Sequence, residues 1–373
     1  MQFDQIIGQD KLKEQLRSFV SSGRIPHAQI FLGPSGCGKL ALAMAFAQYV
    51  LCENKSELSS CGQCKACVKA EKMIHPDIHF SFPTVGTKVT SNDFLASWRE
   101  AVPENPYMDV NQWLQTIGAE NKQGNINVDE CNSIVKKLSF KIFEASHKIL
   151  IMWLPEYLGK EGNRLLKLIE EPPENTLFIL VAERQELILQ TILSRCQLVK
   201  VHRLQDEDII AGLLKKKPEA ESRVQTIAHL ANGNFNDALN LLEQNENDHA
   251  TRFLDWMRKC YKGDGVELVK WGEGFAGAGR ENQKQFVRYA LHFLREFLNL
   301  KMTGNENIRL KDKELATAQN LTKVLGFEQV SEMVSLLDDC YYHIERNANP
   351  KILFLDLSIK MNKILKTPAA VAR

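Results

Sequence analysis

The chain reads Gln29-Ile30-Phe31-Leu32-Gly33-Pro34-Ser35-Gly36-Cys37-Gly38-Lys39 between its first apolar run and an alanine-rich segment. The last seven residues match the pattern G-x-x-x-x-G-K. In a strand–turn–helix context this pattern indicates a phosphate-binding loop, because the glycines let backbone N–H groups wrap an anion while the lysine reaches the outer phosphates. The alternative is an ordinary glycine-rich turn from a strand into a helix. We predict a P-loop, for which ATP or ADP is a candidate ligand; the sequence does not decide whether a nucleotide binds.

Apolar runs alternate with amphipathic segments on the carboxyl side of this loop, at residues 148–154, 177–182 and 198–201. Strands separated by helical patterns imply a parallel sheet covered on both faces. After Arg203 the strand signal disappears and the remainder has helical patterns. We therefore expect an α/β domain over 1–203 with an insertion at about 80–123, a small helical unit over 204–245, and an all-helical domain over 246–373.

Composition describes an ordinary globular protein of two or three domains. The 373 residues are 44% hydrophobic and 25% charged, with a formal net charge of +1. A net charge so close to zero gives the molecule no overall positive field that would attract nucleic acid. We find neither a basic segment followed by an apolar one at the N-terminus nor a run of about 18 apolar residues, so we expect a cytoplasmic protein. We do not expect the nine cysteines of such a protein to form disulfides, so a tight cluster of cysteines is better explained as a metal site.

Four cysteines lie within sixteen residues in the arrangement C-x8-C-x2-C-x2-C: Cys52, Cys61, Cys64 and Cys67. Four thiolates close a tetrahedral shell around Zn²⁺ and leave no open position for water, so the predicted zinc site is structural. Unrelated buried thiols, a redox pair and an iron–sulfur cluster are the alternatives. His75 and His79 are nearby candidates as competing ligands, although a histidine beside a proline is more often a loop residue.

Two positions lack the groups that hold Mg²⁺ in a P-loop ATPase. Leu40 stands where a Ser or Thr hydroxyl coordinates the metal. After the apolar run that ends at Met152, Trp153 and Leu154 occupy the place of the acidic residues that hold the metal and polarise the attacking water. Glu156 follows Pro155 and is expected to lie beyond the end of the strand.

Four further segments carry a family resemblance over roughly residues 1–240. They are Phe3-Asp4-Gln5-Ile6-Ile7-Gly8-Gln9, Gly23-Arg24-Ile25-Pro26-His27-Ala28, Asn163-Arg164-Leu165-Leu166-Lys167-Leu168-Ile169-Glu170-Glu171-Pro172-Pro173, and Thr191-Ile192-Leu193-Ser194-Arg195-Cys196-Gln197. Their order and spacing resemble the clamp-loader branch of AAA+ proteins, which includes the gamma/tau and delta prime subunits of bacterial DNA polymerase III. The resemblance implies an AAA+ P-loop module, a helical lid and a helical collar that mediates oligomerisation.

The departures from the active pattern resemble the delta prime type. Besides Leu40 and Trp153, Asn236 stands where an active family ATPase has a sensor arginine. Arg195 is retained, and by resemblance it is an arginine finger that acts in trans on the neighbouring subunit's ATP. A surface or intrachain ion pair is the alternative for Arg195.

The resemblance implies a DNA polymerase III component that hydrolyses no ATP and supports ATP-driven loading of the sliding clamp on primed DNA. Its partners would be gamma/tau and delta subunits in a hetero-pentamer, together with the clamp and DNA. One rival is an ATPase of the gamma/tau type. A second is a zinc-dependent DNA-binding module, which we disfavour because we find no concentrated basic helix and no ladder of alternating aromatic and basic residues.

Overall fold

The structure is a computed structural model that describes residues 1–120, 122–218, 221–243, 247–304, 310, 312–346 and 348–367. It divides into two compact units, Met1–Leu242 and Glu243–Arg373. Each unit has a hydrophobic core of its own.

A five-stranded parallel sheet is the centre of the first unit. Its strands are β1 (Ala28–Leu32), β2 (Ile78–Ser81), β3 (Lys148–Trp153), β4 (Thr176–Ala182) and β5 (Gln197–Lys200). Their order is β2-β3-β4-β1-β5, and every neighbouring pair is parallel. Every residue of β3 and β4 is buried, as expected for central strands of a sheet covered on both faces. The predicted α/β class is confirmed.

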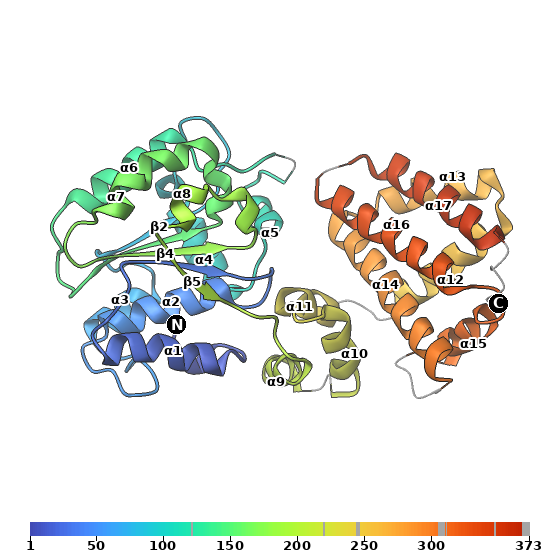
Figure 1. Ribbon diagram of the computed structural model, residues 1–373, viewed down its shortest axis with the longest axis horizontal. Helices are drawn as coiled ribbons and strands as arrows, with labels where there is room; N and C mark the ends of the chain where they lie inside the picture. The colour runs from blue at the N-terminus through green and yellow to red at the C-terminus, as the bar shows by residue number, and fades with distance from the viewer. Residues whose placement is uncertain are drawn as a thin grey trace. The chain divides into compact units, whose positions relative to one another are not determined.

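Helices cover both faces of this sheet, with α1 to α3 on one side and α6 to α8 on the other (Figure 1). Alternate residues of each strand face the two cores: Ile149 and Ile179 face the first, whereas Leu150 and Phe178 face the second. The helices are η1 (Phe3–Gln5), α1 (Asp10–Ser21), α2 (Lys39–Leu51), α3 (Lys65–Glu71), η2 (Ser91–Phe94), α4 (Leu95–Glu104), α5 (Val110–Thr116), α6 (Val128–Ser139), η3 (Pro155–Leu165), α7 (Leu166–Glu170), η4 (Gln185–Leu187), α8 (Gln190–Leu193), α9 (Asp206–Lys216), α10 (Glu221–Ala231) and α11 (Phe235–Glu243).

The segment expected to be an insertion packs through aromatic rings against the end of β3. The Trp98 ring of α4 stacks on Phe82 with ring centroids 4.2 Å apart, and it lies 5.0 Å from Trp113 and 5.3 Å from Trp153. The Trp113 indole N–H donates to the Pro83 carbonyl at 2.8 Å. Trp153 therefore joins α4, and through Trp98 also α5, to the sheet.

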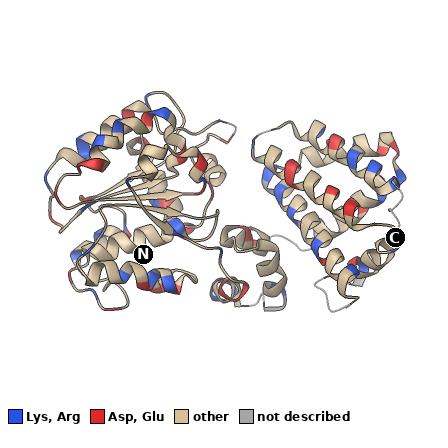
Figure 2. Cartoon of the chain, in the orientation of Figure 1, with Lys and Arg blue, Asp and Glu red and all other residues tan. Residues whose placement is uncertain are grey.

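The second unit is helical in every element that the structure describes. Its helices are α12 (Asn247–Lys262), α13 (Gly265–Ala276), α14 (Arg280–Thr303), α15 (Asp312–Leu321), α16 (Phe327–Glu345) and α17 (Pro350–Lys366). A cluster of aromatic rings fills its core, and the Trp256 indole donates to the Ser358 hydroxyl at 2.8 Å. Acidic and basic residues are interspersed over the helices of both units (Figure 2).

The predicted three-part division remains a prediction. Helices α9 to α11, over which a separate small unit was expected, fall in the same compact unit as the sheet. Among the described residues, no helix is both long enough and apolar enough to cross a membrane.

Candidate functional site

The glycine-rich loop joins β1 to α2, as its pattern predicts. Gly36 and Gly38 have φ angles of 68° and 91°, in the left-handed region that favours glycine, and α2 begins at Lys39. A Cβ on Gly36 would lie 1.6 Å from the Asn234 side-chain oxygen, so the close approach of residue 234 also requires glycine. The Ser35 hydroxyl is buried and has no hydrogen-bond partner among the described residues, which leaves a polar group in the loop for an anion.

Three distant segments cover this loop. The backbone N–H of Phe235 donates to the Gly36 carbonyl at 3.0 Å, and the Gln9 amide donates to the Cys37 carbonyl at 3.2 Å. The Tyr107 ring is so close to Gly38 that a Cβ there would lie 3.0 Å from it. The loop is thus held by the N-terminus, the insertion and the start of α11.

Lys39 is buried and bonded within the chain. Its ammonium donates to the Pro34 carbonyl at 2.5 Å and lies 3.4 Å from a carboxylate oxygen of Glu183. Sequence reasoning missed Glu183. The available signal was its position as the first charged residue after the apolar run 177–182, at the carboxyl end of a strand that turns out to neighbour β1.

The positions that lack magnesium ligands are occupied by core residues. Leu40 packs in the first core of the sheet, and Trp153 belongs to the aromatic cluster at the insertion. Glu156 lies beyond β3, where one of its oxygens accepts hydrogen bonds from the backbone N–H groups of Glu183 and Arg184. Burial raises the pKa of Glu156. The loop backbone therefore fits a phosphate, but these residues do not fit a nucleotide-bound metal.

The four predicted zinc ligands come together. The sulfurs of Cys52, Cys61, Cys64 and Cys67 all lie within 4.8 Å of one another. Backbone N–H groups point at them: Cys61 N–H donates to the Cys52 sulfur at 3.2 Å, Cys64 N–H to the Cys61 sulfur at 3.3 Å, and Cys67 N–H to the Cys64 sulfur at 3.4 Å. Hydrogen bonds from the backbone of Gln63 and Cys64 lower the pKa of Cys61 to about 6, whereas burial raises the pKa of Cys67. The donor set and its spacing fit a closed, structural Zn²⁺ site.

The two nearby histidines do not belong to this group of ligand atoms. The Nδ1 atom of His75 accepts a hydrogen bond from the Asp77 backbone N–H at 3.1 Å, and its Nε2 lies 3.7 Å from a Glu144 oxygen. Burial lowers the pKa of His79 to about 4. His79 lies in β2, next to β3.

Arg195 follows α8 and is 33% exposed. Its Nε atom donates to Glu170 at 2.6 Å, and its Nη1 atom donates to the Thr191 carbonyl at 2.7 Å and to the Ser194 hydroxyl at 3.2 Å. Arg195 precedes the amino end of β5, whereas the P-loop follows the carboxyl end of β1, and these strands are parallel neighbours. The two sites are therefore separated by the length of a strand, roughly 13 Å, and Arg195 cannot serve its own loop.

Asn236 is buried near the P-loop, and its side-chain oxygen accepts a hydrogen bond from the Asn105 amide at 2.7 Å. Position 236 offers no positive charge to a bound phosphate. Asn236 links α11 to the insertion.

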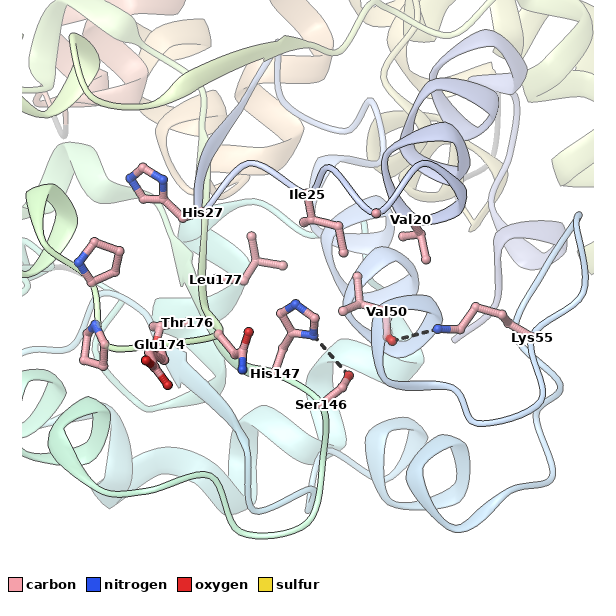
Figure 3. A pocket seen from close by; sticks show the side chains of 14 residues that line it. Val20, Ile25, His27, Val50, Lys55, Ser146, His147, Glu174, Thr176 and Leu177 are labelled. Carbon is pink, nitrogen blue, oxygen red and sulfur yellow. Dashed lines mark hydrogen bonds between the residues drawn. The ribbon is translucent and has the colours of Figure 1, made fainter.

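Two of the family-like segments meet in a pocket of about 540 Å³. Gly23, Ile25 and His27 line it together with Pro172 and Pro173. Figure 3 shows the Lys55 ammonium bonded to the Val50 carbonyl and His147 bonded to Ser146 on one side of this pocket. The pocket is lined at the amino ends of β1, β3 and β4, together with Val20 of α1, with Val50 at the end of α2 and with Lys55 just after it. It is therefore at the opposite end of the sheet from the P-loop.

Several known proteins are similar to this chain. The DNA polymerase III subunit tau of Bacillus subtilis (strain 168) is 24% identical over 379 aligned residues, which cover 94% of this chain and 60% of tau. The DNA polymerase III subunit gamma of Buchnera aphidicola subsp. Acyrthosiphon pisum is 27% identical over 247 residues, covering 65% of this chain and 58% of gamma. The chain thus spans about three fifths of the length of these relatives.

A solved structure of a gamma subunit-related protein from Thermotoga maritima aligns with 95% of this chain and 100% of its own, at 14% identity and a TM-score of 0.41. At this sequence identity and TM-score the similarity supports no further conclusion about the fold.

The sequence profile of one family matches the part of the chain that holds the sheet, the P-loop, the cysteine cluster and Arg195. The family is described as "DNA polymerase III, delta subunit", and the match covers residues 8–205. Because this is more than half of the 373 residues, the chain belongs to the DNA polymerase III delta subunit family.

Proposed function

We propose that this chain is a clamp-loader subunit of the delta prime type, which supports ATP-driven loading of the sliding clamp on primed DNA but hydrolyses no ATP itself. The observation that carries the proposal is the contrast between the two ends of the sheet. At one end the positions for magnesium ligands are filled by Leu40 and Trp153, and at the other end Arg195 is at the surface.

Hydrolysis by a P-loop protein depends on a metal ion that bridges the phosphates and on a group that orients the attacking water. Leu40 and Trp153 supply no oxygen, and both are fixed in packed cores. Lys39 is also engaged by Glu183 and Pro34. These contacts support a role in which the P-loop has a structural purpose or holds a nucleotide that is not turned over.

The proposed contribution of Arg195 is to a neighbouring ATPase subunit. A guanidinium stabilises developing charge on a transferred phosphoryl group, and fingers of this kind contribute about 10³ to 10⁵ in rate. The partners in the proposal are gamma/tau and delta subunits in a hetero-pentamer, the clamp and primed DNA. The zinc ion would hold the segment 52–67 together and take no part in chemistry.

An ATP-hydrolysing subunit of the gamma/tau type is the second candidate. It is favoured by the names of the relatives and by the intact loop with its lysine. The residues around the loop favour the delta prime type.

The test is ATP turnover by the purified full-length chain, with Lys39→Ala as the matched control. We expect no turnover above that of the control, with or without single-stranded or primed DNA. Steady turnover by the wild-type chain that Lys39→Ala abolishes would establish the gamma/tau type instead.

A further inference from the structure

The insertion contributes a side chain to the core of the helices that follow the sheet. Tyr107 lies in the turn between α4 and α5, is 7% exposed, and packs in one hydrophobic cluster with Ile209 and Leu213 of α9 and Phe235 of α11. The centroids of the Tyr107 and Phe235 rings are 4.9 Å apart, and the rings meet edge to face. The insertion is therefore part of the packing beside the P-loop.

The Tyr107 ring also lies against the P-loop itself. A Cβ on Gly38 would lie 3.0 Å from this ring, and the phenol oxygen accepts a hydrogen bond from the backbone N–H of Ile7 at 3.1 Å. Gly38 is the N-cap of α2, and the N-terminus of the helix after a P-loop is where the phosphates of a nucleotide bind. A flat ring held there by apolar packing and one backbone N–H makes the contacts that ligand sites make with an aromatic base.

The phosphate side of the loop is occupied by a carboxylate of the chain. Lys39, the residue that reaches the outer phosphates in a P-loop, is 4% exposed and lies 3.4 Å from a Glu183 oxygen. Its ammonium also donates to the Pro34 carbonyl at 2.5 Å. A phosphate that approached Lys39 would be repelled by the negative charge of Glu183 at close range. Glu183 thus supplies the counter-charge that a phosphate supplies in a nucleotide-bound loop.

Two hydrogen bonds fasten α11 to the loop and to the insertion. The Phe235 backbone N–H donates to the Gly36 carbonyl at 3.0 Å, and the Asn105 amide donates to the Asn236 side-chain oxygen at 2.7 Å. A nucleotide would join the same elements if it were bound between them. Here the chain's own side chains make the connection.

We propose that the insertion is a built-in occupant of the P-loop site, in which Tyr107 takes the place of a nucleobase and Glu183 that of a phosphate charge, so that the site is closed to nucleotide. A site that keeps ADP would require both side chains to move away. The loop itself retains a donor for an anion, because the buried Ser35 hydroxyl has no partner among the described residues. The proposed clamp-loader role is compatible with a closed or an occupied site, so this inference goes beyond it.

The test measures binding of three probes to the full-length chain by titration calorimetry without magnesium: adenosine, inorganic tripolyphosphate and ADP. Tyr107→Ala removes the ring, Glu183→Gln removes the charge, and the double variant removes both. Tyr107→Phe keeps the ring and is the control for the first change. Glu186→Gln, which removes an exposed carboxylate from η4, is the control for the second. Thermal unfolding shows whether each variant is folded.

We expect no measurable binding of any probe to the wild-type chain. Tyr107→Ala should bind adenosine, because an apolar cavity left by a ring accepts another flat ring. Glu183→Gln should bind tripolyphosphate through Lys39. The double variant should bind ADP at least about tenfold more tightly than either single variant, and adding Lys39→Ala should remove this gain. Both controls should behave as the wild type does.

Two results would overturn the proposal. One is binding of ADP to the wild-type chain in the micromolar range, since the site would then be open. The other is a folded double variant that binds ADP no better than the wild type. If Tyr107→Ala does not fold, Glu183→Gln decides, because it leaves the core intact: binding of tripolyphosphate supports the proposal and its absence contradicts it.

These measurements are separable from the test of the proposed function. Binding of ADP without turnover would end the inference of a closed site and leave the clamp-loader role as proposed. Turnover of ATP by the wild-type chain would contradict both.

Discussion

Asp77 shows how much a single buried side chain contributes to this fold. It is nearly inaccessible to solvent, yet it fixes the loop after α6 through three consecutive backbone N–H groups. Burial raises the pKa of Asp77, but the hydrogen bonds from residues 143, 144 and 145 outweigh burial, and the pKa lies below its ordinary value of 3.8. The ionised carboxylate is therefore the form that stabilises the fold.

Asp77→Asn should lower the free energy of unfolding of the first unit by about 1 to 3 kcal/mol at pH 7, because the amide NH₂ group would face a donor. A carboxylate with a lowered folded-state pKa stabilises above pH 3.8 and loses its contribution as the pH falls through the folded-state value. The difference between variant and wild type should thus shrink below pH 3.8. Urea unfolding followed by tryptophan fluorescence at pH 7 and pH 3.5 measures both effects. The exposed Asp4→Asn is the control, and an equal loss in that variant would contradict the argument.

A functional side chain could be predicted where the residues that identify it lie close together in the sequence. The P-loop pattern and the four cysteines each lie within a short stretch of sequence, so the place of the loop before α2 and the close approach of the sulfurs could be predicted. Binding of nucleotide or zinc there stays a prediction. Glu183, Tyr107 and Asp77 were missed because each acts on a partner more than 60 residues away, through a sheet order that no local pattern contains. The sequence could not predict that Phe140 and Phe143 are exposed either, since apolar residues are usually buried.

At the scale of elements, β3 and the insertion depend on each other. An acidic residue at position 153 would hold a metal in an ATPase, but here the position supplies an aromatic ring to the cluster of Trp98 and Trp113. The insertion was expected from its prolines and glycines alone, and its purpose could not be derived from the sequence. The cluster explains why the strand ends in tryptophan.

Trp153→Asp should destabilise the first unit by more than about 3 kcal/mol, because it places a charge in an aromatic core and removes a large side chain. It should create no ATPase activity, and neither should the double variant with Leu40→Thr. Denaturant unfolding and ATP turnover are the measurements, with Trp153→Phe, which keeps an uncharged aromatic ring at this position, as control. A stable Trp153→Asp chain that hydrolyses ATP would show that the missing acid was the sole defect.

The cysteine cluster is also an element-scale feature, since Cys64 caps the N-terminus of α3 through its sulfur. We expect about one zinc ion per chain, and Cys64→Ala should lose the metal together with thermal stability. Metal analysis of the purified protein and thermal unfolding test this, with the buried Cys131→Ala as the matched control. A folded, zinc-free wild-type chain, or a Cys64→Ala variant that keeps both metal and melting temperature, would disprove the site.

At the scale of the whole molecule, the parallel sheet separates the P-loop from Arg195. The ion pair of Arg195 with Glu170 is about one third to one half exposed, so it contributes at most about 1 kcal/mol to stability. A finger acting on a neighbour contributes far more to rate. The two roles therefore predict different results.

Arg195→Ala should leave the melting temperature of the isolated chain and its incorporation into a reconstituted clamp loader nearly unchanged, while clamp-dependent ATP turnover falls. The loss should be measured per active site, because in the proposed assembly the other interfaces would have arginine fingers of their own. Arg164→Ala, which removes an exposed arginine also paired with a glutamate, is the control. Strong destabilisation of the isolated chain, or unchanged turnover in the assembly, would assign Arg195 a structural role.

The opposite placement of loop and arginine gives the subunit a direction. In a head-to-tail assembly each subunit contributes its arginine to the next subunit and receives an arginine at its own P-loop. Every interface is then heterologous, because it joins two different surfaces. A member whose loop has lost its metal ligands gains nothing from the arginine it receives, but its own arginine remains useful. In the proposed assembly this chain therefore lies at one end of the series of ATP-hydrolysing interfaces. The face that carries its P-loop takes part in no hydrolysis and is available for another contact.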